Sequence, residues 1–177
     1  MAKINRIGFG QLEPNHLSAQ RNGQVYGQLP CAKSIDTLEN GQFVKYDYAA
    51  ENGGEVNFTG AGEWMLVYNE VKLYDDFWRE SYKDFALVTK NYDRGEMVPR
   101  VLKTMPGDIF TTNCLEGKGV RGVEFTGTEE IEVGSVLAPN ANGYLSLAGD
   151  VDHIKFQVVK VYTMPDGQAA VKVMRIA

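Results

Sequence analysis

The chain has 177 residues, with 18 basic and 23 acidic side chains and a net charge of -5. A chain of this length forms one domain or two small ones and buries a core that needs no disulfide or metal. The mild acidity, without clustered Lys and Arg, argues against nucleic-acid binding, and no stretch approaches the roughly 20 apolar residues of a membrane span.

The first 30 residues carry isolated apolar side chains between glycines and prolines, without a period of 2 or 3.6. This pattern predicts an extended N-terminal arm over residues 1–30 that buries its apolar groups on another surface. An edge strand folded back on its own domain is the equal alternative. Met1–Gly10 lacks the apolar core of a signal peptide, so we expect the protein to stay in the cell that makes it.

Strands are predicted at Gly41–Tyr48 and Glu63–Tyr74. After Glu63, the second continues with consecutive apolar residues, without a polar residue between them. This pattern favours burial on both faces, in the middle of a sheet. Asp75–Phe85 spaces its aromatic residues as a helix does. We expect a short helix or structured loop there with its aromatic face in the core; a partner-binding face is the alternative.

Short strands are also predicted at Arg100–Lys103, Asp108–Thr112, Glu130–Val133 and Gly143–Leu147. A boundary near Met105–Gly107 would divide the β-rich module of residues 31–177 into two lobes. The chain then closes with two Val-rich segments, 155–162 and 169–176, joined by Pro165, Asp166 and Gly167. That arrangement predicts a C-terminal β-hairpin.

Asn-Gly pairs recur along the chain and supply the positive φ angles of tight hairpin turns. They stand at 22–23, 40–41, 52–53 and 142–143. Their recurrence predicts a mainly β fold: a small β-barrel or β-sandwich with the extended arm and at most one or two short helices.

The residues capable of chemistry do not form a recognisable motif. Cys31 and Cys114 are far apart in sequence and lack a C-x-x-C spacing, so both are expected to be buried or half-buried thiols in a reducing compartment. His16 stands alone, and His153 follows Asp150 and Asp152 in a segment that is expected to be a solvated loop. We therefore predict no catalytic, cofactor-binding or metal-binding residues.

Several stretches from Gly107 onward resemble one kind of viral protein. They are Gly107–Thr112, Glu132–Leu137, Asn142–Leu145, Phe156–Tyr162 with Pro165–Gln168, and Val171–Ile176. These stretches look like the auxiliary capsid proteins of tailed bacteriophages, the decoration or cement proteins. Met1–Ile7 and Leu38–Val44 also resemble structural proteins from phages of Gram-positive hosts.

The resemblance implies a non-enzymatic, mostly β virion protein made in the host bacterial cytoplasm. It would bind the major capsid protein on the outside of the head in many copies, often as trimers, without contacting nucleic acid or membrane. The predicted arm would supply the capsid contacts, through Ile4, Arg6, Ile7, Phe9, Leu17 and Tyr26.

Two other functions stay open at this stage. The first is a phage tail, head-fibre or receptor-facing structural protein, because such proteins also use small β-modules. The second is a small β-barrel enzyme that uses acids such as Glu129 or Asp152, which would require a deep polar cleft.

Overall fold

The computed structural model describes residues 9–50, 53–69, 86–88, 98–116, 131–147, 149, 154–163 and 168–177. Within this part the protein is mainly β with one short helix, as the sequence predicts. The segment Asp75–Phe85, the turn at Pro165–Gly167, and the residues Glu129, Asp150, Asp152 and His153 lie outside the described residues.

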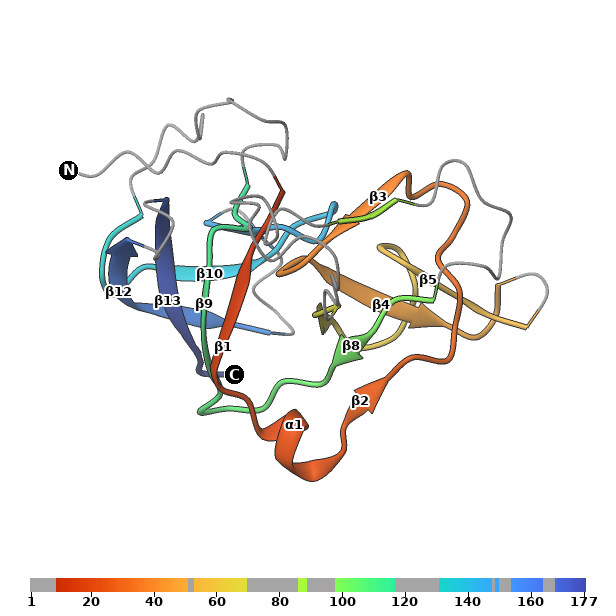
Figure 1. The fold of residues 1–177 in the computed structure, drawn as a ribbon, viewed down its shortest axis with the longest axis horizontal. Coiled ribbons are helices and arrows are strands. Elements are labelled where there is room, and N and C mark those ends of the chain that lie inside the picture. Colours follow the sequence, from red (N-terminus) through yellow and green to blue (C-terminus); the bar gives the residue numbers. More distant parts are fainter. Residues whose placement is uncertain are drawn as a thin grey trace, which may run out of the picture.

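A curled six-stranded antiparallel sheet forms one half of the fold (Figure 1). Its order is β1 (Leu12–His16), β9 (Ile109–Thr112), β13 (Ala169–Arg175), β12 (Phe156–Thr163), β10 (Val136–Pro139) and β11 (Leu145–Ser146). β12 and β13 pair antiparallel from Phe156↔Arg175 to Thr163↔Ala169, which confirms the predicted C-terminal hairpin.

The second half is a five-stranded sheet. Its order is β2 (Val25–Tyr26), β8 (Val101–Leu102), β6 (Met65–Val67), β4 (Phe43–Asp47) and β5 (Glu55–Asn57). The position of β6 confirms a mid-sheet strand for Met65–Val67 of the predicted segment, whose residues 70–74 lie outside the described residues. A further pair, β3 (Thr37–Glu39) with β7 (Ala86–Val88), extends this half.

The five-stranded sheet is apolar on both faces because it separates two clusters of buried side chains. Phe43 of β4 packs in the cluster shared with the six-stranded sheet, whereas its neighbour Val44 points into the other cluster. Successive side chains of a strand point to opposite faces, so a strand between two cores must be apolar at consecutive positions.

Three phenylalanines join the sheets. Phe43 lies with its ring centroid 5.2 Å from that of Phe156 of β12 and 6.3 Å from that of Phe110 of β9, and the Phe110 and Phe156 centroids are 5.5 Å apart. All three side chains are fully buried. The core therefore runs without a break from one sheet to the other.

Much of the predicted arm is built into these sheets. Leu12 pairs with Thr112 on the edge of the six-stranded sheet, and Tyr26 pairs with Val101 on the edge of the five-stranded sheet. The helix α1 (Ser18–Asn22) connects the two edges. From residue 12 onward, the segment therefore forms edge strands of its own domain, which was the alternative to an extended arm. The apolar groups of this segment find their partners within the same chain.

The backbone conformations of the glycines explain the role of the Asn-Gly pairs and why one predicted strand does not form. Gly53 (φ 92°) and Gly143 (φ 76°) lie between paired strands, but Gly23 (φ 69°) ends α1 and Gly41 (φ 91°) joins strands that do not pair. The strand predicted at Glu130–Val133 is wrong for residues 131–133, because Gly134 (φ 95°) forms a turn and the strand starts at Val136. Positive φ thus marks turns here, of which only some are hairpins.

Candidate binding site

A pocket of about 410 Å³ opens on the five-stranded sheet. β2, β4, β6 and β8 each contribute to it or border it, and the loops after β4 and before β6 complete its wall. Its lining combines aromatic rings with three charged groups: Tyr26, Tyr46, Asp47, Tyr48, Ala49, Ala61, Gly62, Glu63, Met65 and Lys103. We refer to it as the tyrosine pocket.

Tyr26, Tyr46 and Tyr48 form a row in which each ring contacts the next edge to face. The ring centroids of Tyr26 and Tyr46 are 6.1 Å apart with the planes at 74°, and those of Tyr46 and Tyr48 are 5.8 Å apart at 85°. Edge-to-face contact is a favoured geometry for aromatic pairs because it places the positive ring edge on a negative face. The pocket therefore has a rigid aromatic wall.

The strand alternation of β4 creates this wall. Tyr46 and Tyr48 are two residues apart, so their rings lie on the same side of the chain. Tyr46 packs in the cluster that contains Val56 and Met65. Tyr46 is buried, and the backbone N–H of Gln28 donates to its hydroxyl at 3.5 Å. Burial raises the pKa of Tyr46, so its hydroxyl keeps its proton. Tyr48, at 70% exposure, leaves its ring open to a ligand.

The charged groups of the pocket are held in place. Lys103 Nζ lies 2.9 Å from Glu63 Oε2, and Arg175 Nη1 lies 3.4 Å from Glu63 Oε1. The hydrogen bond from Lys103 to Glu63 raises the pKa of Lys103, so the ammonium stays charged. Asp47 accepts from the backbone N–H of Ala49 at 3.0 Å and from Asn57 Nδ2 at 3.2 Å. The lining thus carries two acids and one base, and Arg175, which lies outside the lining, adds a second positive charge beside Glu63.

Gly62 brings the loop against β4. A Cβ atom at this position would lie 2.6 Å from the carbonyl oxygen of Tyr46, closer than real Cβ contacts allow. Asn57 Oδ1 fixes the same loop by accepting from the N–H groups of Thr59 and Gly60. The loop is thus shaped before any ligand arrives.

A second hollow of about 390 Å³ lies on the other side of this loop, and both hollows are lined by Ala61, Gly62 and Glu63. Here Lys45 Nζ stands 4.6 Å from the ring centroid of Trp64, a cation–π contact. Trp64 is buried, and its Nε1 has no hydrogen-bond partner in the part of the chain that is described.

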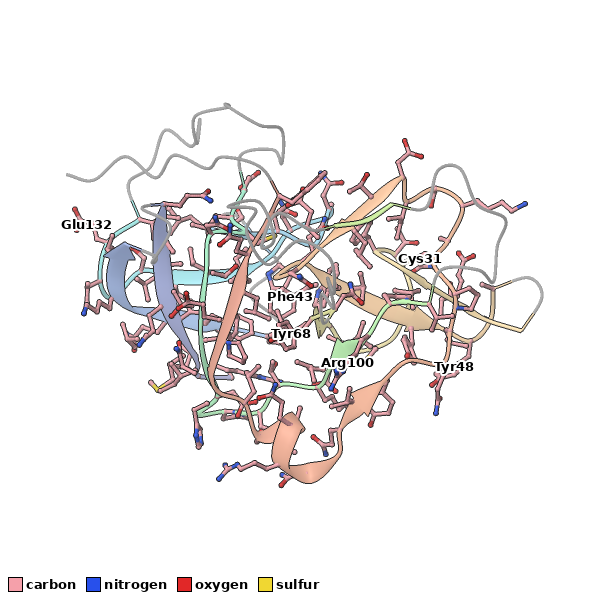
Figure 2. All side chains as sticks on the ribbon, in the orientation of Figure 1. Cys31, Phe43, Tyr48, Tyr68, Arg100 and Glu132 are labelled. Atoms are coloured by element: carbon pink, nitrogen blue, oxygen red, sulfur yellow. The ribbon has the colours of Figure 1, made fainter. Side chains whose placement is uncertain are left out.

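A second candidate surface lies at the far end of the molecule. Val133, 65% exposed, precedes Gly134, whose N–H donates to the carbonyl oxygen of Val158 at 2.7 Å. Val159 is the unpaired residue of a β-bulge in β12 and is 37% exposed. Figure 2 shows Glu132, next to Val133, at one end of the long axis and Tyr48 at the other. We call Val133 and Val159 the valine rim.

The predicted capsid-contact residues fall in different environments. Ile4, Arg6 and Ile7 lie outside the described residues, and Phe9 is half-buried. Leu17 is only 3% exposed and packs in the shared core, so it cannot serve as an exposed contact. Tyr26 is half-buried and lines the tyrosine pocket.

Most of the other pocket residues could not be predicted from the sequence. The alternation Tyr46-Asp47-Tyr48 was a local signal for a face with two aromatic rings. Lys103 and Glu63 gave no such signal, because their meeting depends on the pairing of β6 with β8.

The cysteines are as predicted. Cys31 and Cys114 are both buried and neither forms a disulfide, and burial raises the pKa of Cys31 to about 12. In the described ranges, no group of three or more His, Cys, Asp or Glu side chains is placed to hold a metal ion. The same ranges contain no helix with the length and apolar character to cross a membrane.

Comparison of the chain with protein-family models, with curated proteins and with solved structures finds no match.

Proposed function

We propose that this protein is a decoration protein of a tailed bacteriophage, which binds the major capsid protein on the outside of the head and stabilises the lattice. One observation supports the proposal most. Within the described residues, the stretches from Gly107 onward that resemble such proteins contribute to a single sheet. They form or adjoin β9, β10, β11, β12 and β13.

The valine rim is the part of that sheet best suited to attachment. Exposed apolar side chains at neighbouring positions gain free energy when a partner covers them. Hydrogen bonds from Glu132 N–H to Ser135 Oγ (3.0 Å) and from Ser135 N–H to Glu132 O (3.0 Å) stabilise the turn that carries Val133. The bulge at Val159 redirects the strand locally. A rigid apolar rim loses little conformational entropy on binding.

Avidity would strengthen a small contact of this kind. If the protein binds as a trimer at symmetry points of the head, the second and third contacts form within one complex. Their effective concentration is then set by geometry, and the overall affinity exceeds that of one contact by orders of magnitude.

Co-sedimentation with heads that lack the protein tests the proposal. The purified protein is mixed with such heads, pelleted through a cushion and counted per head on gels. We expect saturation at a whole-number multiple of the lattice sites. The double variant Val133→Asp, Val159→Asp should lose most binding, because two charges would have to be buried, while Tyr48→Ala should bind as the unmodified protein does.

Two results of this experiment would contradict the proposal or part of it. Wild-type protein that stays in the supernatant would refute head decoration, and labelling confined to tails would support the alternative of a tail or fibre protein. Full binding by the double variant would retain decoration and remove the valine rim as the contact.

The arm has its own test. Since β1, α1 and β2 belong to the fold, a deletion that probes the arm must stop before Phe9. Removal of residues 2–8 should weaken head binding and leave the circular dichroism spectrum unchanged. Undiminished binding would exclude Ile4, Arg6 and Ile7 as capsid contacts.

A further inference from the structure

We infer that the tyrosine pocket is a binding site for a neutral saccharide, a function separate from attachment to the head. The inference comes from the pocket alone and does not depend on the valine rim or on the identity of the capsid partner.

The aromatic wall suits one face of a sugar ring. A pyranose has a face of C–H groups and a rim of hydroxyls, so it packs an apolar face on an aromatic ring while its hydroxyls reach polar groups. Tyr48 is 70% exposed and is held at its edge by Tyr46. A large aromatic side chain that is held on one side and open on the other offers its ring face to a ligand, and covering that face gains free energy.

The polar rim matches the hydroxyls. Each carboxylate has about four lone-pair sites, and the contacts of Asp47 and Glu63 described above leave acceptor positions on both. Lys103 adds N–H donors beside Glu63. Hydroxyls both donate and accept, so they pair with either type of group without a formal charge.

Pairing of the charges favours a neutral ligand. Lys103 from the lining and Arg175 from outside it both lie within 4 Å of Glu63, so this acid is already paired. An anionic ligand would meet Asp47 and Glu63, and a cationic one would meet Lys103. A neutral ligand avoids the desolvation of an unpaired charge.

The size and rigidity of the pocket also fit a small ligand. Its volume of about 410 Å³ falls within the range of roughly 300–1,000 Å³ that is usual for such sites. Gly62 and the hydrogen bonds of Asn57 hold its loop in place before binding. The figure of the side chains places Tyr48 at the end of the molecule away from Glu132 (Figure 2).

The test uses the full chain and defined trisaccharides. The neutral probes are maltotriose, mannotriose and tri-N-acetylchitotriose, and a sialylated trisaccharide is the charged probe. Saturation-transfer-difference NMR detects binding and calorimetry measures it. We expect at least one neutral probe to bind and the sialylated probe not to bind. Tyr48→Ala should weaken the binding by about tenfold or more, whereas Tyr48→Phe keeps the ring and should retain it.

Two controls make the outcome decisive. Val133→Asp changes the other end of the molecule and should leave saccharide binding unchanged. Equal thermal unfolding of wild type and Tyr48→Ala shows that the exposed ring was removed without loss of the fold. The inference is overturned if none of the neutral probes binds, or if Tyr48→Ala binds as well as wild type.

Head co-sedimentation separates this inference from the proposed function. If Tyr48→Ala loses head binding, the pocket is a contact for the capsid protein and the saccharide inference is wrong. If the heads are bound through the valine rim and no saccharide binds, decoration stands and the inference fails. If a saccharide binds and no head does, the pocket is confirmed and decoration fails.

Discussion

Replacement of Phe156 by Ala should destabilise both sheets together. Phe156 belongs to β12, its ring is fully buried, and it touches the rings of Phe43 from the five-stranded sheet and Phe110 from its own sheet. Removal of a buried Phe side chain costs roughly 3–5 kcal/mol, and each aromatic pair is worth about 0.5–1.5 kcal/mol beyond area burial. Since two pairs are lost, we expect the upper part of that range, about 4–5 kcal/mol.

Urea unfolding followed by two probes measures the effect. Far-UV circular dichroism reports the whole chain, and the fluorescence of Trp64, in a Trp78→Phe background, reports the five-stranded half where it adjoins the shared core. A domain of this kind that loses about 4–5 kcal/mol out of a typical 5–15 kcal/mol keeps only a marginal fold. We expect the two transitions to coincide in wild type and to move to lower urea together in the variant.

The result that would refute this reasoning is separation of the two probes. If Phe156→Ala shifts only the dichroism transition, the sheets unfold independently and behave as the two lobes that the sequence suggested around residues 105–107. A loss below about 1 kcal/mol would show that the core collapses around the cavity. Val159→Ala on the same strand is the control: its side chain is partly exposed and should cost no more than about 0.5 kcal/mol.

Three further predictions follow from single groups. Asp108 is buried and accepts three hydrogen bonds, from groups at the start of α1 and in the loop before β9. Asp108→Ala should lower the free energy of unfolding in urea by about 1–3 kcal/mol, because buried donors lose their acceptor. An unchanged urea midpoint would contradict this prediction. Gly62→Ala forces a Cβ to within 2.6 Å of Tyr46 O and should cost about 1–3 kcal/mol, whereas Gly27→Ala, with nothing within 4 Å, should be nearly neutral. Burial raises the pKa of Cys31 from 9.0 to about 12. Between these pH values the folded state keeps a proton on the thiol that the unfolded state releases. The contribution of this thiol to the free energy of unfolding is therefore complete below pH 9 and falls as the pH rises toward 12. Urea midpoints measured across that window should decline less in Cys31→Ala, and parallel declines would refute the assignment.

Local patterns were enough for the strands with strong turn signals. The C-terminal hairpin was predicted because two Val-rich segments flank Pro165, Asp166 and Gly167, and the strand containing Met65–Val67 was predicted in mid-sheet because its apolar residues are consecutive. The prediction of a strand at Glu130–Val133 was wrong for residues 131–133, because Gly134 turns the chain before the next strand begins at Val136. Short β patterns next to glycine do not fix where a strand starts.

The arm shows why the sequence left two interpretations open. Scattered apolar residues in residues 1–30 need a surface, but the pattern does not say whether that surface is the same chain or another one. Leu17 is buried among side chains of its own core, and Leu12 pairs with Thr112. These contacts join segments about a hundred residues apart, so no local rule could reveal them.

The amino-acid sequence by itself determined that this is a mainly β protein with two buried thiols, because turn chemistry, strand alternation and residue hydrophobicity act over a few neighbouring residues. Only the tertiary structure decided that Tyr26, Tyr46 and Tyr48 share a pocket with Glu63 and Lys103. It also decided that Tyr48 and Glu132 lie toward opposite ends of the molecule (Figure 2). The physical reason is that antiparallel pairing brings distant strands together, and the order of strands in a sheet depends on the packing of the entire core.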